Sequence, residues 1–88
     1  MKTIEFVVGD PLGLHARPAG LLVKVAQGFE SESTLTLART VKSVSLKRLL
    51  AVMGLAVKGE DHITITVEGA DEDRAAEAIE AWLHEHLK

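Results

Sequence analysis

The stretch Ile63-Thr64-Ile65-Thr66-Val67 decides the fold, because it is the clearest strand in the chain. Its apolar side chains alternate with threonines, so one face of the strand is predicted to lie against a core. Gly69 follows, and the acidic run Asp71-Glu72-Asp73 suits the N-terminus of a helix, where the helix dipole favours negative charge. The chain therefore ends in a strand and a helix, and the apolar stripe of this helix consists of Ala75, Ala78, Ile79, Trp82 and Leu83.

Another strand and helix open the chain. Residues Thr3–Val8 alternate with period two, which predicts a half-buried strand. The cluster Gly9-Asp10-Pro11-Leu12-Gly13 then requires a loop. From Leu14 to Phe29 the apolar spacing is helical; Pro18 fits the first turn, where a missing N–H costs nothing, and Gly28 marks the end.

The middle of the chain predicts two short strands and a short helix. Thr34–Leu37 and Val41–Val44 read as strands, joined by the turn Ala38-Arg39-Thr40, which lacks the Gly or Asn that tight hairpins prefer. Ser45 is expected to cap a helix whose apolar positions fall at i, i+3, i+4 and i+7, namely Leu46, Leu49, Leu50 and Met53.

The resulting order, βαββαβα, predicts an α+β fold. An open-faced two-layer sandwich, with a four-stranded antiparallel sheet covered on one face by three helices, buries every apolar stripe at once. No repeat, linker or low-complexity segment divides the chain, so residues 1–88 are expected to form one domain.

Composition excludes several classes of function. The net charge is −3 and there are only three aromatic residues, which argues against a nucleic-acid partner. There is no cysteine, and the longest apolar run, residues 49–57, is far too short for membrane insertion, so we expect a cytoplasmic protein. A chain of 88 residues has little interior for a catalytic cleft, which favours a carrier or docking module over an enzyme that turns over small molecules.

The segment Gly13-Leu14-His15-Ala16-Arg17-Pro18-Ala19 carries the candidate chemistry. It joins a glycine-containing loop to a helix N-terminus, where free N–H groups and the helix dipole attract an anion. Arg17 adds a planar cation that matches phosphate oxygens, and His15 supplies a nucleophilic imidazole lone pair. The residues alone indicate an anion site with a possible nucleophile; a surface or helix-capping histidine is the alternative.

This heptapeptide resembles the active-site signature of the histidine-containing phosphocarrier (HPr) family of the phosphoenolpyruvate-dependent sugar phosphotransferase system. The resemblance covers essentially the whole chain, since further segments recur in the family's order: Val44-Ser45-Leu46-Lys47, Val52-Met53-Gly54-Leu55, Ile63-Thr64-Ile65 and Gly69-Ala70-Asp71-Glu72. It implies an HPr-like fold, and no cofactor or metal. It also implies that His15 accepts a phosphoryl group on Nδ1 from phosphorylated Enzyme I and passes it to IIA domains of sugar permeases. Arg17 would stabilise that group, together with the backbone amides of Ala16 and Arg17.

The family resemblance also implies a docking surface beside the histidine. The matching apolar positions are Leu49, Leu50 and Met53 on the second helix, with Gly20 and Leu21 on the first. The cations Lys24, Lys47 and Arg48 would steer acidic partners toward this surface. The alternative is that the apolar stripe belongs to the core, with either Leu49 or Leu50 buried.

The sequence departs from the family pattern in three places. Arg48 stands where many Gram-positive relatives carry a regulatory serine, so no regulatory phosphoserine is expected there, and neither Ser43 nor Ser45 is expected to replace it. The hairpin after Phe29 is about two residues longer than usual, which should leave phosphotransfer intact. Gly20 replaces a larger residue and could alter partner contact.

Three readings of the function stay open at this stage. The leading one is a monomeric sugar-uptake phosphocarrier that uses Enzyme I and IIA domains. The rivals are a paralogous carrier in a nitrogen-linked regulatory chain and a binding module that transfers no phosphate. The other histidines, His62, His84 and His86, lack the spacing of a metal site.

Overall fold

The computed structural model describes residues 1–88 and contains the seven predicted elements in the predicted order. Their bounds are β1 Lys2–Val7, α1 Ala16–Gln27, β2 Glu32–Leu37, β3 Lys42–Ser45, α2 Leu49–Gly54, β4 His62–Glu68 and α3 Glu72–His86. No helix is long and apolar enough to cross a membrane.

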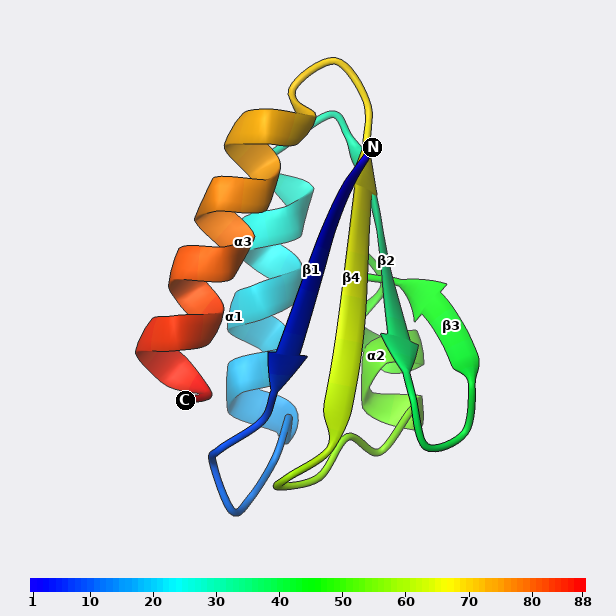
Figure 1. The fold of residues 1–88 in the computed structure, drawn as a ribbon, viewed down its shortest axis with the longest axis vertical. Coiled ribbons are helices and arrows are strands. Elements are labelled where there is room, and N and C mark those ends of the chain that lie inside the picture. The colour runs from blue at the N-terminus through cyan, green and yellow to red at the C-terminus, as the bar shows by residue number, and fades with distance from the viewer.

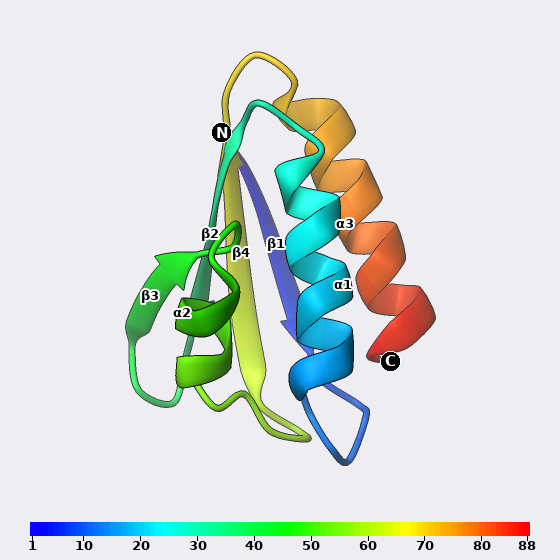
Figure 2. The same ribbon diagram turned by 180° about the vertical axis from the view of Figure 1, so that it is seen from behind.

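The four strands form one antiparallel sheet in the order β1-β4-β2-β3. The stretch 62–68 that anchors the sequence interpretation is an inner strand, because β4 pairs with both β1 and β2. Ile65 lies opposite Ile4 on one side and Leu35 on the other, so apolar side chains form a continuous row on the core face. All three helices lie on that face, which confirms the open-faced sandwich (Figures 1 and 2).

The core lies between the sheet and the helices and consists of 22 buried apolar side chains. Leu22 of α1 and Ile79 and Leu83 of α3 are fully enclosed, and each such side chain contributes about 1.5–3 kcal/mol. Ala78, predicted in the buried stripe of α3, is only half-buried. The rest of that stripe is buried as predicted.

The predicted start of the second helix is wrong. Ser45 is the last residue of β3, and α2 begins only at Leu49, with Arg48 as its N-cap. The Ser45 Oγ instead accepts a hydrogen bond from the Lys47 amide, 3.2 Å away. Leu46 is fully buried in the turn between β3 and α2, so its place in the apolar pattern reflects burial outside the helix.

The β2–β3 turn contains no glycine, and a non-glycine residue takes up its left-handed position. Strand β3 begins at Lys42 rather than at the predicted Val41. Val41 instead lies in the turn and adopts a left-handed conformation, with φ of 56°. A β-branched residue rarely adopts this conformation. Arg39 of the same turn pairs with Asp61, which comes directly before β4.

Asp71 ties the start of β2 to the start of α3. It occupies the N-cap of α3, but its carboxylate accepts hydrogen bonds from the Glu30 amide, the Ser31 amide and the Ser31 hydroxyl. These donors, the Ser31 hydroxyl first, lower the pKa of Asp71 to about 2. The acidic run predicted for the helix start thus also fixes α3 to the end of the sheet away from the β1–α1 loop.

Candidate functional site

His15 lies at the N-cap of α1 with an exposed side chain. Its backbone is extended, with φ of −82° and ψ of −175°, and its carbonyl accepts the Ala19 amide at 2.9 Å. The imidazole forms no hydrogen bond or ion pair with any other group of the protein. Both ring nitrogens are therefore accessible to a reaction partner.

The first turn of α1 offers unpaired donors beside this ring. The amides of Ala16 and Arg17 donate to no protein acceptor, and Pro18, in the same turn, has no N–H. The guanidinium of Arg17 is exposed and pairs with no carboxylate. A helix N-terminus with free amides and a cation is suited to hold the oxygens of a phosphoryl group.

The loop before His15 is held at several points. Leu14 is buried, and its amide donates to the Val57 carbonyl at 3.0 Å. Gly13 adopts φ of 66°, and a Cβ there would lie 2.3 Å from that same carbonyl oxygen, so only glycine fits. The Leu87 carbonyl accepts the amides of Gly9 and Asp10 at 2.7 and 3.3 Å. His15 is thus an exposed residue on a fixed support.

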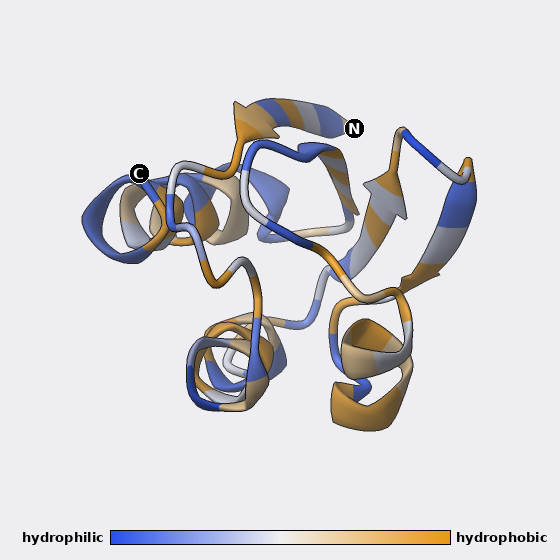
Figure 3. Cartoon of the chain, turned by 90° about the horizontal axis from the view of Figure 1, so that it is seen from below, coloured by the Kyte–Doolittle hydropathy of each residue, from blue (hydrophilic) through white to orange (hydrophobic).

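The predicted docking residues lie on two neighbouring helices. The helices α1, which carries Leu21, and α2, which carries Leu49, Leu50 and Met53, are in contact with each other. All four side chains are exposed, and Leu50 is 84% exposed. The alternative that Leu49 or Leu50 is buried is wrong, because α2 contacts the core through Val52. Figure 3 shows α2 as predominantly hydrophobic.

The predicted cations around this surface differ in their environment. Lys24 and Arg48 are exposed and form no ion pair, and Gly20 is half-buried on α1. Lys47 is half-buried, and its ammonium donates to the Phe29 carbonyl at 2.9 Å, near the C-terminal end of α1. The structure therefore does not bring the Lys47 ammonium to the end of α1 that carries His15.

Comparisons with known proteins identify the family of this chain. A family model described as "PTS HPr component phosphorylation site" matches residues 2–85, a segment that contains His15. The chain belongs to the HPr family. Two relatives named phosphocarrier protein HPr are 48% identical (Lysinibacillus sphaericus, 97% of this chain and 94% of the relative) and 44% identical (Mycoplasma pneumoniae, 98% and 97%). The protein is accordingly a phosphocarrier of the phosphotransferase system.

Solved HPr structures share the fold over nearly the whole chain. A mycoplasma histidine-containing phosphocarrier protein aligns with a TM-score of 0.90 and 36% identity over 96% of this chain and 93% of the other. HPr from Bacillus anthracis aligns with a TM-score of 0.83 and 34% identity over 92% and 94%. The expectations of fold and family are therefore confirmed.

The remaining histidines of the chain lie outside the site. His62 is exposed at the start of β4, while His84 packs edge-on against Phe6 and His86 lies against the Trp82 ring. No group of His, Asp and Glu side chains has the arrangement of a metal site. Only His15 combines exposure with a helix N-terminus.

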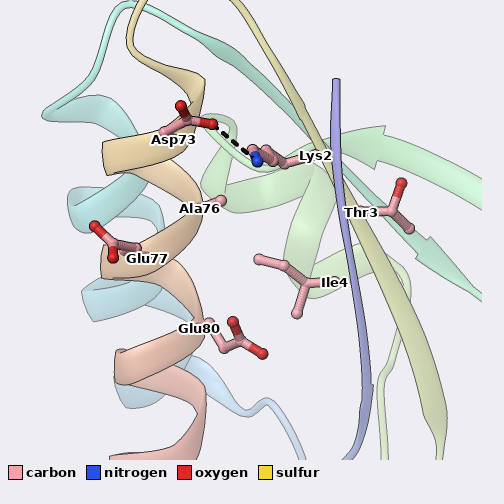
Figure 4. A pocket seen from close by; sticks show the side chains of 7 residues that line it. All are labelled: Lys2, Thr3, Ile4, Asp73, Ala76, Glu77 and Glu80. Carbon is pink, nitrogen blue, oxygen red and sulfur yellow. Dashed lines mark ion pairs between the residues drawn. The ribbon is translucent and has the colours of Figure 1, made fainter.

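Two cavities are present, and neither is lined by His15 or Arg17. One, of about 380 Å³, lies between β1 and α3, where Lys2 forms a 3.1 Å ion pair with Asp73 (Figure 4). The other, of about 570 Å³, includes Val7 and His62. His15 and Arg17 are thus exposed residues outside both cavities.

The sequence interpretation missed one exposed apolar residue near the site. Leu12 is 71% exposed in the loop that leads to His15, and its amide donates to the Asp10 carboxylate at 2.9 Å. A leucine among loop-forming residues was the available signal, because an exposed large apolar side chain marks a contact surface when others lie nearby.

Proposed function

We propose that His15 accepts a phosphoryl group on Nδ1 from phosphorylated Enzyme I and passes it to IIA domains of sugar permeases. The observation that carries the proposal is the exposed imidazole of His15 beside the unpaired amides of Ala16 and Arg17. Membership of the HPr family supports it.

Phosphoryl transfer to His15 requires a correctly positioned nucleophile and positive charge around the phosphoryl oxygens. The Nδ1 lone pair attacks phosphorus, and the bond between phosphorus and the Enzyme I donor atom breaks with its electron pair leaving on the donor. The Arg17 guanidinium and the two free amides bind the phosphoryl oxygens in the loose transition state. Protonation of Nε2 then makes the imidazole a good leaving group when a nucleophile of the IIA domain attacks.

The exposed apolar surface on α1 and α2 would bring both partners to the same histidine. We expect the exposed side chains of Leu21, Leu50 and Met53 to form its centre, with contributions from Gly20 and Leu49, and the exposed cations Lys24 and Arg48 to provide positive charge at its edge. Methionine suits a surface that must fit two different partners, because its side chain adapts its shape.

A labelling experiment tests the proposal. Incubation with phosphoenolpyruvate and Enzyme I should add one phosphate that is labile in acid and stable in base, as expected for a phosphohistidine. His15→Ala should take up none, whereas the matched control His62→Ala should be labelled fully, because His62 is an exposed histidine outside the site. An acid-stable phosphate, or label that persists in His15→Ala, would overturn the assignment. No label on the wild-type protein would favour a binding module.

A further inference from the structure

The loop that carries His15 rests directly on a second loop, residues 56–61, which we call the support loop. The backbones approach so closely that a Cβ on Gly13 would lie 2.5 Å from the Lys58 Cα, and one on Gly59 would lie 2.9 Å from the Asp10 carbonyl oxygen. The Leu14 amide is hydrogen-bonded to the Val57 carbonyl. A displacement of the support loop must therefore move the residues just before His15.

The support loop has a conformation that its own residues do not favour. Ala56 and Glu60 are not glycines, yet both have positive φ, 56° and 70°. Each left-handed non-glycine residue costs about 1 kcal/mol or more and persists only where the surroundings enforce it. External contacts must therefore hold this loop in place.

Arg39 and Asp61 supply those contacts. The Arg39 guanidinium donates from Nε to Asp61 Oδ1 and from Nη2 to Oδ2, both at 3.1 Å, and Nη2 also reaches the Ala56 carbonyl at 3.4 Å. Asp61 Oδ2 in turn accepts the Lys58 amide at 2.8 Å. The two residues thus clamp both ends of the support loop and one amide between them.

The electrostatics agree with a clamp rather than a loose surface pair. The Asp61 side chain is only 13% exposed, and the Arg39 guanidinium and the Lys58 amide hold the pKa of its carboxyl below its usual value. A bidentate arginine–carboxylate pair of this kind fixes orientation as well as charge.

We propose that Arg39 and Asp61 are positioning residues for phosphotransfer. Their contacts fix the conformation of the support loop, and the support loop in turn fixes the position of Gly13 and Leu14, directly before His15. This inference rests on the proposed function. Figure 1 shows three loops at the same end of the molecule: the β2–β3 turn, the support loop and the β1–α1 loop that leads to His15. If Arg39 has this role, the β2–β3 turn, which was expected to leave phosphotransfer intact, contributes to it through this residue.

The test compares Arg39→Ala and Asp61→Asn with the control Lys2→Ala. Lys2 forms an ion pair of the same length, 3.1 Å, with Asp73 at the opposite end of the sheet. We expect Arg39→Ala and Asp61→Asn to lower the maximal rate of phosphorylation by Enzyme I about tenfold, with KM changed less than twofold. Arg39→Lys, which keeps the charge and one donor, should recover part of the rate. Lys2→Ala should leave both constants unchanged.

A second measurement separates positioning from general stability and needs no Enzyme I. In Arg39→Ala the NMR amide resonances of residues 13–17 should shift and the Leu14 amide should exchange faster, while α3 resonances should stay in place. Unmoved resonances at 13–17, or an unchanged maximal rate, would overturn the proposal. An equal loss of rate in Lys2→Ala would also overturn it. If the wild-type protein took up no phosphate, the proposed function would fail, whereas unmoved resonances contradict only the clamp.

Discussion

Arg17 is the only cation within four residues of His15, and it has no carboxylate partner. Its guanidinium is therefore available for phosphoryl oxygens, which it matches with two parallel donors. We predict that Arg17→Ala slows phosphoryl transfer about a hundredfold, the typical effect of removing one donor to a developing negative charge. Stopped-flow or rapid-quench transfer from Enzyme I measures this rate.

Arg74→Ala is the matched control for Arg17→Ala. Arg74 is also an exposed arginine in the first turn of a helix, but it lies on α3. Its removal should leave the rate unchanged, and both variants should keep the wild-type unfolding temperature, because exposed substitutions rarely change stability by more than about 0.5 kcal/mol. Equal rates in Arg17→Ala and the wild-type protein would remove Arg17 from the mechanism.

Residue roles could be predicted from the sequence where the contacts are local. His15, Arg17 and Pro18 lie within one helical turn, so their relation follows from spacing alone. The Arg39–Asp61 clamp joins residues 22 positions apart, and the bond from Lys47 to Phe29 spans 18. The local sequence does not show that Arg39 and Lys47 are bonded to other groups of the protein, because their partners depend on the tertiary fold.

Helix α2 carries the most exposed side chain of the proposed docking surface, that of Leu50. Leu50 is 84% exposed, so Leu50→Ala should not change stability measurably. We predict that it raises the KM for phosphorylation by Enzyme I about tenfold, equivalent to about 1.4 kcal/mol of binding energy, with little effect on the maximal rate. Steady-state kinetics with this protein as the varied substrate provide the measurement.

Val7→Ala is the corresponding control on the sheet. Val7 is an exposed apolar residue at the end of β1, outside α1 and α2. If Val7→Ala and Leu50→Ala raise KM equally, or if neither does, α2 is not the docking element.

The elements themselves were predictable where hydrophobic periodicity is unambiguous. Alternation identifies β1 and β4, and the i, i+3, i+4 spacing identifies α1 and α3. The start of α2 was not predictable, because Leu46 fits the helical stripe of Leu49 and Met53 as well as it fits a buried position in the turn before the helix. The left-handed conformation of Val41 was also not predictable, since the turn contains no residue type that prefers this conformation.

The whole molecule distributes its charge unevenly, although its net charge is only −3. Residues 11–59, which include α1 and α2, carry seven lysines and arginines against two carboxylates. Residues 60–88, which include α3, carry nine carboxylates against two basic side chains. The helix α1, which has His15 as its N-cap, and α2, which contacts α1, thus lie in the basic part of the chain, and an acidic partner would be steered toward them.

A pair of charge reversals tests this steering. Arg48 and Arg74 are exposed cations at the N-terminal ends of α2 and α3, so a glutamate at either position suits the helix dipole. Each reversal changes the net charge from −3 to −5. We predict that Arg48→Glu lowers kcat/KM for Enzyme I at low salt by roughly threefold to tenfold, whereas Arg74→Glu has little effect. The difference should shrink as salt rises toward ~1 M, where the Debye length is only about 3 Å. Equal losses in both variants would mean that net charge, not the position of the cation at the start of α2, governs the encounter.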